Sequence, residues 1–366
     1  MWLTIIVFII VLGLIVLVHE LGHFWTARKL GVKVEEFGFG FPPRIFGRKH
    51  KGVIYSLNWI PLGGFVKIKG EAGEAKDDPD SFSHQSAGRR TLILSAGVIM
   101  NVLFAFVLLT AGFMIGLPSV VDDLPAGARV DSTHIQIVQV EPDSVAQNLA
   151  LQLGDEIVSI DEQQFSSVVA ITDYIRNDQD KILALQLKRY GEDLHLTADL
   201  TSQDVPVLGV YLAKTGLVHY PWYQAIWEGA QATVNVLWQI VYAFYSLLAG
   251  LLSGAGTSLQ VAGPVGVAVM TGQMAKLGFV YLLQFAALLS LNLAIINILP
   301  FPALDGGRIL FVIIEKIRRR PNNEMIEAVI HNIGFFLLIF LMFVVTYKDL
   351  ARYGGRIWGV FSGWFG

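Results

Sequence analysis

The sequence predicts a polytopic α-helical membrane protein with about four transmembrane helices, a membrane-associated β-hairpin region and an inserted α+β domain. Of its 366 residues, 54% are hydrophobic and 16% are charged, whereas a soluble domain carries about a quarter charged residues. The apolar residues gather in long blocks that approach or exceed the roughly 20 residues needed to span a bilayer. A more polar stretch of about 100 residues, the size of one small domain, lies between two of these blocks.

Composition also limits the chemistry. The formal net charge of −3 offers no overall basic surface for phosphates, so nucleic acid is not an expected partner. The chain has no cysteine, which excludes disulfides, thiolate zinc sites and thiol nucleophiles. Any metal must therefore be held by His, Asp or Glu.

The apolar blocks predict four transmembrane helices. They are expected at residues 1–25, 91–117, 277–316 and 326–348. The first block has no basic leading segment, no small-residue cleavage site follows it, and it ends in ionisable residues. It is therefore interpreted as a membrane helix and not as a signal peptide.

The charges of the loops predict the orientation. Residues 26–90 carry 12 Lys and Arg against 7 Asp and Glu, and residues 316–320 hold a second basic cluster. The positive-inside rule puts both in the cytoplasm, where residues 26–90 would form a membrane-associated β region. Residues 119–221 carry 6 basic and 16 acidic residues, which favours the opposite side. The chain is expected to start outside, cross four times and end in an extracytoplasmic tail at residues 349–366.

Residues 216–276 are expected to form an amphipathic or interfacial helical region. Within it, Val234–Leu252 is apolar enough to span the bilayer. A fifth crossing, however, would put residues 316–320 outside and move Asp305 away from the depth of His19. This helix is therefore expected to be buried against the other spans or to lie in the interface.

Residues 118–215 are expected to fold as one extracytoplasmic domain. His134–Val140 and Ile182–Leu187 have strand patterns, and Val169–Arg176 is typical of a short helix. Leu151–Asp161 resembles the signature of PDZ domains, which bind a peptide as an added strand. The Gly-Leu-Gly-Phe-like carboxylate loop of those domains is missing, and a purely structural spacer is the alternative interpretation.

The first apolar block ends in a metal-binding pattern. His19, Glu20 and His23 form the sequence HExxH. On a helix, residues four apart share a face, so both imidazoles can bind one Zn²⁺ while the glutamate polarises its water. The alternative is a pair of interfacial histidines that pair with Glu20.

A catalytic zinc has three protein ligands and an open position. Asp305 is the only carboxylate between Phe279 and Ile314, and it ends the stretch that begins at Asn297 and contains two prolines. Irregular backbone at membrane depth is tolerated only against protein or a wet cavity. Asp305 is thus the candidate third ligand, and the alternative is a salt bridge to Arg308.

These motifs together resemble the site-2 protease family, in particular the bacterial regulator-of-sigma-E type of intramembrane zinc metalloprotease. HExxH lies in the first span, NxxPxxxLDG in a later one and a PDZ-like insert between them. Further matching stretches are Phe37–Arg44, Pro61–Phe65 and Gly263–Gly266. The best-known members carry two tandem PDZ domains, whereas one fits here.

The resemblance implies a role for each site residue. His19, His23 and Asp305 would bind zinc, Glu20 would be the general base, and Asn297 would bind the substrate backbone near the scissile bond. A core amide that satisfies the broken helix is the alternative for Asn297. The chain would be a multi-pass protein of the bacterial inner membrane, in contact with lipid, with HExxH near the cytoplasmic side.

The implied substrates are single-span membrane proteins, such as an anti-sigma factor already trimmed outside by another protease, with the insert acting as a size filter. Because a transmembrane helix hides its amides, it must be unwound before cleavage. Val53–Lys69 is strand-like with a turn expected at Gly63-Gly64. The hypothesis is a hairpin whose edge pairs with the unwound substrate, and the alternative is a hairpin that merely packs on the first span.

Two other functions remain open from the sequence. One is a non-catalytic membrane scaffold whose PDZ-like domain recruits partners and whose histidines are structural. The other is a metal transporter, which would need a polar path across the bilayer, and the spans supply no second set of ligands. His331 is isolated in its span and is interpreted as an interfacial residue near a helix start.

Overall fold

The computed structural model describes residues 2–121, 124–125, 127–141, 144–177, 181–189, 191–201, 207–253 and 262–362. The chain divides into two compact units. The first, here called the helical unit, contains residues 1–109, 230–272 and 285–366. The second, here called the insert unit, contains residues 110–229 and 273–284.

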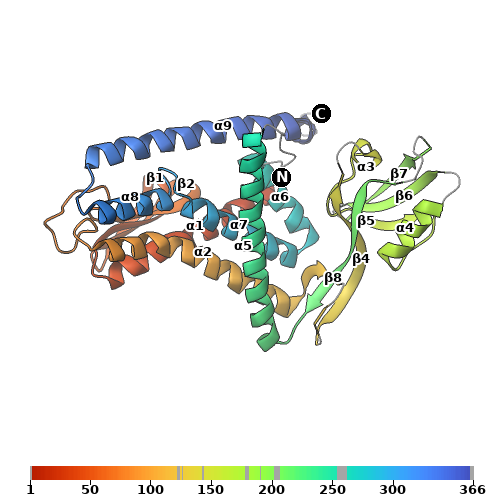
Figure 1. Ribbon diagram of the computed structural model, residues 1–366, viewed down its shortest axis with the longest axis horizontal. Helices are drawn as coiled ribbons and strands as arrows, with labels where there is room; N and C mark the ends of the chain where they lie inside the picture. The colour runs from red at the N-terminus through yellow and green to blue at the C-terminus, as the bar shows by residue number, and fades with distance from the viewer. Residues whose placement is uncertain are drawn as a thin grey trace. The chain divides into compact units, whose positions relative to one another are not determined.

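Long apolar helices dominate the described residues (Figure 1). Five of them have the length and composition to cross a membrane: α1 (Trp2–Lys29), α2 (Ala87–Ile115), α5 (Trp222–Ser253), α7 (Phe279–Ile298) and α9 (Glu324–Ser362). Two shorter helices, α6 (Pro264–Leu277) and α8 (Asp305–Arg318), have 14 residues each. The expected long apolar helices are thus confirmed, and α5 adds a candidate span to the four expected.

The expected interfacial region and the expected tail contain longer helices than the sequence suggested. α5 has 32 residues, as long as the spans themselves, and residues 254–261 of the same region lie outside the described residues. The tail from residue 349 continues α9 to Ser362. Its last four residues, 363–366, are also outside the described part of the chain.

The segment expected as the third span contains two helices. α7 ends at Ile298 and α8 begins at Asp305, so the prolines at 300 and 302 break the helix as predicted. Glycine is required just after the break: a Cβ at Gly306 would lie 2.2 Å from the Ile298 carbonyl oxygen, and one at Gly307 would lie 2.2 Å from that of Phe301. These two glycines let α8 fold back against the end of α7.

Between α1 and α2, two long strands form the predicted hairpin: β1 (Val34–His50) and β2 (Val53–Ile68). Both residues of the turn expected at Gly63-Gly64 are assigned to β2, and β2 changes direction just before them, since segments 54–57 and 64–68 run in opposite directions beside 36–39. The tight turn between β1 and β2 lies at Lys51 and Gly52, with φ angles of 47° and 84°. Two consecutive positive φ angles are typical of the type I′ turn, which matches the twist of hairpin strands.

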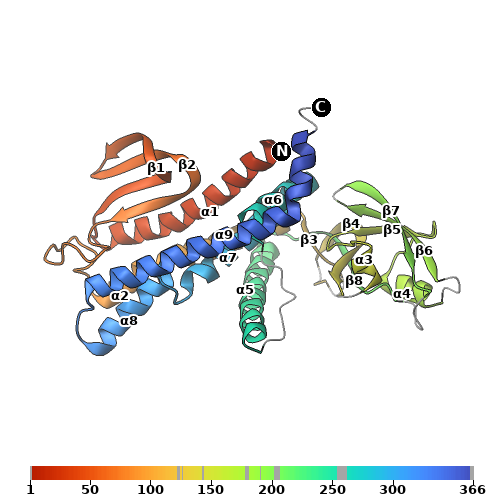
Figure 2. The same cartoon turned by 90° about the horizontal axis from the view of Figure 1, so that it is seen from above.

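The two strands bend so that their segments lie beside one another next to α1 (Figure 2). Residues 34–39 have register partners on two sides, at 64–68 and at 54–57, and residues 44–50 pair with 53–58. Among the described residues, segment 64–68 therefore pairs on one side only. The buried side chains where α1, α2, α8 and the strands meet form one apolar cluster: Phe24, Ala27, Val32, Val34, Val53, Ile68, Phe82, Ile93, Leu94 and Val312.

α6 and α9 are joined by a buried carboxylate. Asp349 of α9 is only 5% exposed and accepts a hydrogen bond from the Gly266 backbone N–H at 2.7 Å. Space is tight here, since a Cβ at Gly263 would lie 2.8 Å from Asp349 Oδ2. The Gly263–Gly266 stretch is therefore the start of a helix, and the N–H of Gly266 in its first turn is satisfied by a partner helix.

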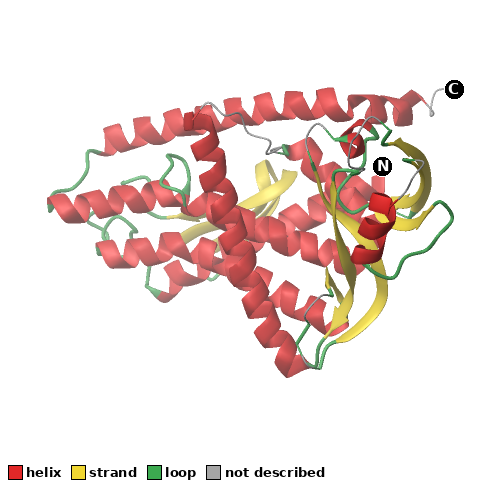
Figure 3. Cartoon of the chain, turned by 45° about the vertical axis from the view of Figure 1, so that its right-hand side comes forward, coloured by secondary structure: helices red, strands yellow, loops and turns green. Residues whose placement is uncertain are grey.

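The insert unit contains an antiparallel sheet and two short helices (Figure 3). Its sheet has the order β3-β8-β4-β5-β6-β7. The strands are β3 (Leu117–Val120), β4 (Arg129–Val140), β5 (Glu156–Ile160), β6 (Ile182–Arg189), β7 (Glu192–Asp199) and β8 (Val210–His219). The helices are α3 (Val145–Asn148) and α4 (Val168–Asn177). Both predicted strands and the predicted helix are confirmed within these bounds.

The insert unit has its own apolar core, and its first and last strands, β3 and β8, pair with each other. Its PDZ-like stretch contributes Asp155, which is 1% exposed and pairs with Arg189 Nε and Nη2 at 2.6 Å each. A bidentate pair of this kind ties the start of β5 to β6. β3 and β8 pair antiparallel, with Val120 opposite Thr215, so the chain enters and leaves the sheet through neighbouring strands.

Candidate metal centre

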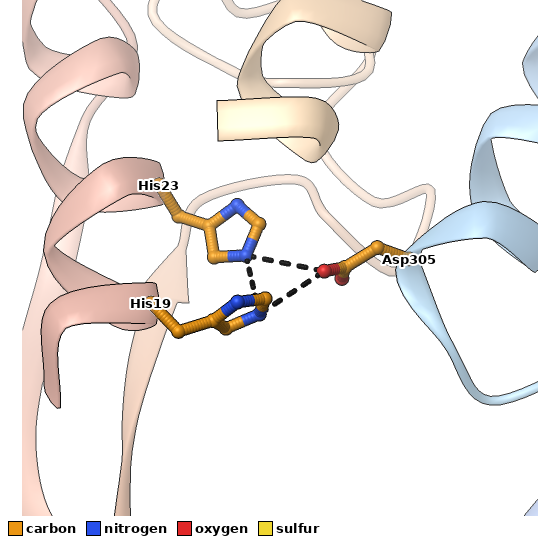
Figure 4. Close-up of side chains that lie close together, drawn as sticks. All are labelled: His19, His23 and Asp305. Atoms are coloured by element: carbon orange, nitrogen blue, oxygen red, sulfur yellow. Dashed lines mark hydrogen bonds and ion pairs between the residues drawn. The ribbon is translucent and has the colours of Figure 1, made fainter. Parts of the chain in front are cut away.

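The two histidines of HExxH lie on one face of α1, as their spacing predicts. His19 and His23 are 5% and 6% exposed, and their Nε2 atoms are 3.2 Å apart. The rings are nearly perpendicular, at 81°. Figure 4 shows both Nε2 atoms directed toward the same point, where Asp305 approaches from α8.

Asp305 completes a group of three ligand atoms. Its Oδ2 lies 3.1 Å from His19 Nε2 and 3.4 Å from His23 Nε2. Zinc bonds of about 2.0–2.2 Å in tetrahedral geometry separate two ligand atoms by roughly 3.3 Å. All three distances match that separation, and Asp305 Oδ2 is buried with no hydrogen-bond donor among the described residues. These residues therefore fit a zinc ion.

The alternative partner for Asp305 is contradicted. Arg308 forms its ion pair with Glu71, in the loop after β2. Near the other end of α8, Arg90 of α2 forms a bidentate pair with Glu315, at 3.1 and 2.7 Å. Arg308 is thus occupied by another carboxylate, and Asp305 faces the two imidazoles.

α2 fixes the orientation of the imidazoles from behind. His23 Nδ1 lies 2.8 Å from the Ile93 carbonyl oxygen. A hydrogen on Nδ1 donated to this oxygen leaves Nε2 free to bind a metal. His19 Nδ1 lies 3.4 Å from the amide nitrogen of the fully buried Asn101, whose Oδ1 has no donor among the described residues. A half-turn of that amide would give His19 the matching acceptor.

Glycine allows α1 and α2 to approach closely at the site. A Cβ at Gly97 would lie 2.4 Å from His23 Nε2 and 2.7 Å from His19 Cε1. A Cβ at Gly22 would lie 2.3 Å from the Ala96 carbonyl oxygen. Small residues at such contacts are the usual device for close helix packing in membranes.

Sequence reasoning missed the contribution of α2. Ile93, Gly97 and Asn101 are four residues apart, so they lie on one helical face. The only polar side chain in this stripe is an amide inside an apolar block, and this was the available signal. The other two contributions are the backbone carbonyl of Ile93 and the absence of a side chain at Gly97, and neither can be recognised from a sequence motif.

Glu20 and Asn297 lie on the borders of the metal group. A Cβ at Gly64 of β2 would be 3.9 Å from Glu20 Cγ, so the one-sided segment of β2 passes beside this carboxylate. Asn297, near the end of α7, has its Nδ2 3.3 Å from His19 Nε2. All five residues predicted from the sequence are therefore in one place, with Glu20 and Asn297 next to the three ligand atoms.

The profile of peptidase family M50 matches residues 7–341. This chain belongs to peptidase family M50. As a member of this site-2 protease family it is a metalloprotease with zinc as its cofactor. The scaffold interpretation with purely structural histidines is therefore set aside. Among the described residues, His19, His23 and Asp305 are the one group of three side chains that could hold a metal ion.

Relatives along nearly the whole chain agree with the M50 assignment. The regulator of sigma-E protease RseP of Escherichia coli is 30% identical, over 94% of this chain and 98% of the relative. The zinc metalloprotease RasP of Geobacillus kaustophilus is 28% identical, over 96% and 98%. A putative zinc metalloprotease of Clostridium perfringens is 36% identical, over 92% and 95%.

One solved structure resembles part of this chain. The PDZ domain of an SdrC-like protein from Listeria innocua aligns with 22% of this chain and 92% of that domain, at 22% identity and a TM-score of 0.20.

Proposed function

We propose that this chain hydrolyses peptide bonds within the membrane segments of single-span proteins, as a step of regulated intramembrane proteolysis. The observation that carries the proposal is the convergence of His19, His23 and Asp305 from two helices of an apolar helical unit. A soluble protease would place such a group in a water-filled cleft of a polar protein. Here the group belongs to helices composed for lipid.

Each site residue has a proposed role. His19 Nε2, His23 Nε2 and an Asp305 carboxylate oxygen hold the zinc ion. When bound, zinc acts as a Lewis acid for the attacking water and for the scissile carbonyl. Glu20 takes the proton from the water and passes it to the leaving amine, the work of a general base that then becomes a general acid. Ile93 and Asn101 keep the two imidazoles in the tautomer that binds metal.

Asn297 is proposed to bind the substrate backbone. Its amide lies 3.3 Å from His19 Nε2, so a peptide next to the metal group would be within its reach. An amide can donate to a carbonyl and accept from an N–H, which suits it to one peptide unit. Fixing the scissile peptide in this way converts binding energy into orientation.

The substrate must present an extended backbone to this site. Segment 64–68 of β2 pairs with 34–39 on one side only, and Gly64 lies beside Glu20. An unwound substrate segment that adds as a strand to this free edge would have its amides directed past Glu20 and the metal group. Strand addition also replaces the hydrogen bonds that the substrate loses when its helix unwinds.

Water is proposed to arrive from the cytoplasmic side. A cavity of about 410 Å³ lies between the loop after β2, α8 and the start of α9, and its lining includes Glu71, Arg308 and Glu315. The charged side chains in this lining support the entry of water next to the helix that carries Asp305. The basic residues of 26–90 and 316–320 favour the same orientation in the bacterial inner membrane.

The acidic insert unit is proposed to lie outside the cytoplasm and to select the substrate. Intact single-span proteins would be refused, and those already trimmed outside by another protease, such as an anti-sigma factor, would be admitted. The name of the Escherichia coli relative, regulator of sigma-E protease RseP, favours this substrate class.

The decisive experiment combines metal analysis with cleavage. Purified wild-type protein is expected to contain about one zinc per chain and to cleave a model single-span substrate, and His23→Ala is expected to lose most of the metal. Glu20→Gln is expected to keep the metal but lose cleavage by at least about 100-fold, the usual contribution of general acid–base catalysis. Full activity in Glu20→Gln would disprove the mechanism, and wild-type protein without zinc would disprove the site.

A further inference from the structure

The backbone that delivers Asp305 is irregular and weakly fixed by its own sequence. Asp305 is the first residue of α8, and the N-cap residue Leu304 makes no side-chain hydrogen bond to the helix. Helix starts usually rely on such a bond for one of their free N–H groups. Ala303 has a φ of 76°, a left-handed conformation that is uncommon for a residue with a side chain. The turn before Asp305 therefore needs support from elsewhere.

α9 supplies that support. His331 Nδ1 accepts a hydrogen bond from the Ala303 backbone N–H at 2.9 Å. One helical turn further on, a Cβ at Gly334 would lie 2.5 Å from Pro302 Cβ and 2.6 Å from the Pro302 carbonyl oxygen. The same face of α9 thus contacts the turn twice, through a hydrogen bond and through close packing.

The ring of His331 is also held from α8. It lies 5.3 Å from the Phe311 ring, centroid to centroid. Because Nδ1 accepts a hydrogen bond, the ring hydrogen is on Nε2, and Nε2 is buried with no partner among the described residues. His331, interpreted from the sequence as a lone interfacial residue, is therefore committed to a single hydrogen bond two residues before Asp305.

We propose that His331 is a positioning residue for the metal centre: by accepting the Ala303 N–H it holds the left-handed turn, and through the turn it sets the place of the Asp305 carboxylate. The proposal rests on the proposed role of Asp305 as a zinc ligand. A carboxylate at the first position of a helix moves with the backbone before it. A turn that relaxes toward ordinary φ would carry Oδ2 away from the two imidazoles.

The test compares three variants of the full chain. His331→Asn places an amide oxygen near the position of Nδ1 and keeps the acceptor, whereas His331→Leu removes it. Asn332→Leu, at the next residue of α9, is the matched polar-to-apolar control. Zinc affinity is measured by competition with a chelator, and ligand geometry by the visible absorption of the Co²⁺-substituted protein.

His331→Leu is expected to bind zinc about tenfold more weakly, at the lower end of the effect of groups that orient metal ligands. Its Co²⁺ spectrum is expected to shift toward a site with a looser third ligand. His331→Asn and Asn332→Leu are expected to keep the wild-type affinity and spectrum. Cleavage should lose kcat more than KM, since the substrate edge at 64–68 is untouched.

A double variant, Ala303→Gly combined with His331→Leu, separates positioning of the metal ligand from the general stability of the protein. Glycine adopts a φ of 76° without strain, so Ala303→Gly in the His331→Leu background is expected to recover part of the lost zinc affinity. The proposal is overturned if folded His331→Leu binds zinc like wild type, or if His331→Asn loses as much affinity as His331→Leu. Wild-type protein that binds neither metal would instead contradict the proposed function.

Discussion

At Gly97 the two imidazoles of the metal centre leave no room for a side chain. Its hydrogen occupies the place where a Cβ would meet both imidazoles. The same helix carries Gly88, where a Cβ would have nothing within 4 Å. Gly88 lies in the first turn of α2 and Gly97 in its interior, so Gly88→Ala controls for an alanine in this helix that fills no space at the site.

Gly97→Ala is expected to weaken zinc binding by about 10- to 100-fold. Forcing a methyl group into a filled space costs about 1–3 kcal/mol, and each 1.4 kcal/mol is tenfold in affinity. Gly88→Ala is expected to leave zinc binding unchanged and to raise the melting temperature slightly, because alanine favours a helix over glycine by about 1 kcal/mol. Chelator competition and thermal unfolding measure both effects, and equal zinc affinity in the two variants would refute the packing argument.

The five predicted site residues and the α2 residues differ in how sequence reveals them. His19, Glu20, His23 and Asp305 are ionisable groups in apolar blocks, where a charged or polar side chain is costly and marks function. The roles of Ile93 and Gly97 depend on a main-chain carbonyl and on empty space. Neither property differs between one apolar helix and another until the helices are packed together.

Among the elements, the hairpin shows both the reach and the limit of sequence patterns. Strand character over Val53–Lys69 was predictable from alternation and β-branched residues. The pair Gly63-Gly64 predicts a turn, and β2 does change direction just before it, whereas the tight turn at Lys51-Gly52 was not expected. A lysine with positive φ is strained, and the pairing of the whole hairpin must outweigh that strain. The same pairing brings Gly64 of β2 beside Glu20.

Val66→Pro is the test of strand addition at segment 64–68. Proline has no N–H and fills the space beside the strand, so cleavage is expected to fall by at least about fivefold, the value of one lost backbone hydrogen bond. Zinc content is expected to stay at the wild-type level. Val66→Ala keeps the N–H and serves as the control for the lost side chain. Undiminished cleavage by a folded Val66→Pro protein would exclude pairing at this edge.

At the scale of the whole molecule, the chain combines a helical unit with an insert unit that has its own apolar core. The membrane class and the insert were predictable because composition changes abruptly at both borders. The length of α5 was not predictable in this way. The distribution of charged residues between the loops favoured an even number of crossings without this helix, yet α5 has 32 residues, the length of a span. Hydropathy finds apolar helices, but it does not say what each helix lies against.

The paired strands β3 and β8 allow the insert unit to be removed cleanly. Because Val120 and Thr215 are register partners, residues 121–214 can be replaced by a short Gly-Ser turn without moving the strand ends. The shortened protein is expected to cleave an untrimmed single-span substrate that the full chain refuses. Both proteins are expected to cleave the trimmed substrate at similar rates, measured by gel assay in proteoliposomes. Continued refusal of the untrimmed substrate, with normal cleavage of the trimmed one, would count against selection by the insert.

The ligand atoms of the metal group come from opposite ends of the polypeptide, with His19 in the first helix and Asp305 in the eighth. During synthesis the ribosome delivers the first helix to the bilayer long before it has translated residue 305. With the proposed ligand set, a nascent chain holds two imidazoles and a glutamate but no third ligand. We therefore expect proteolytic capacity to arise only when biosynthesis is almost finished.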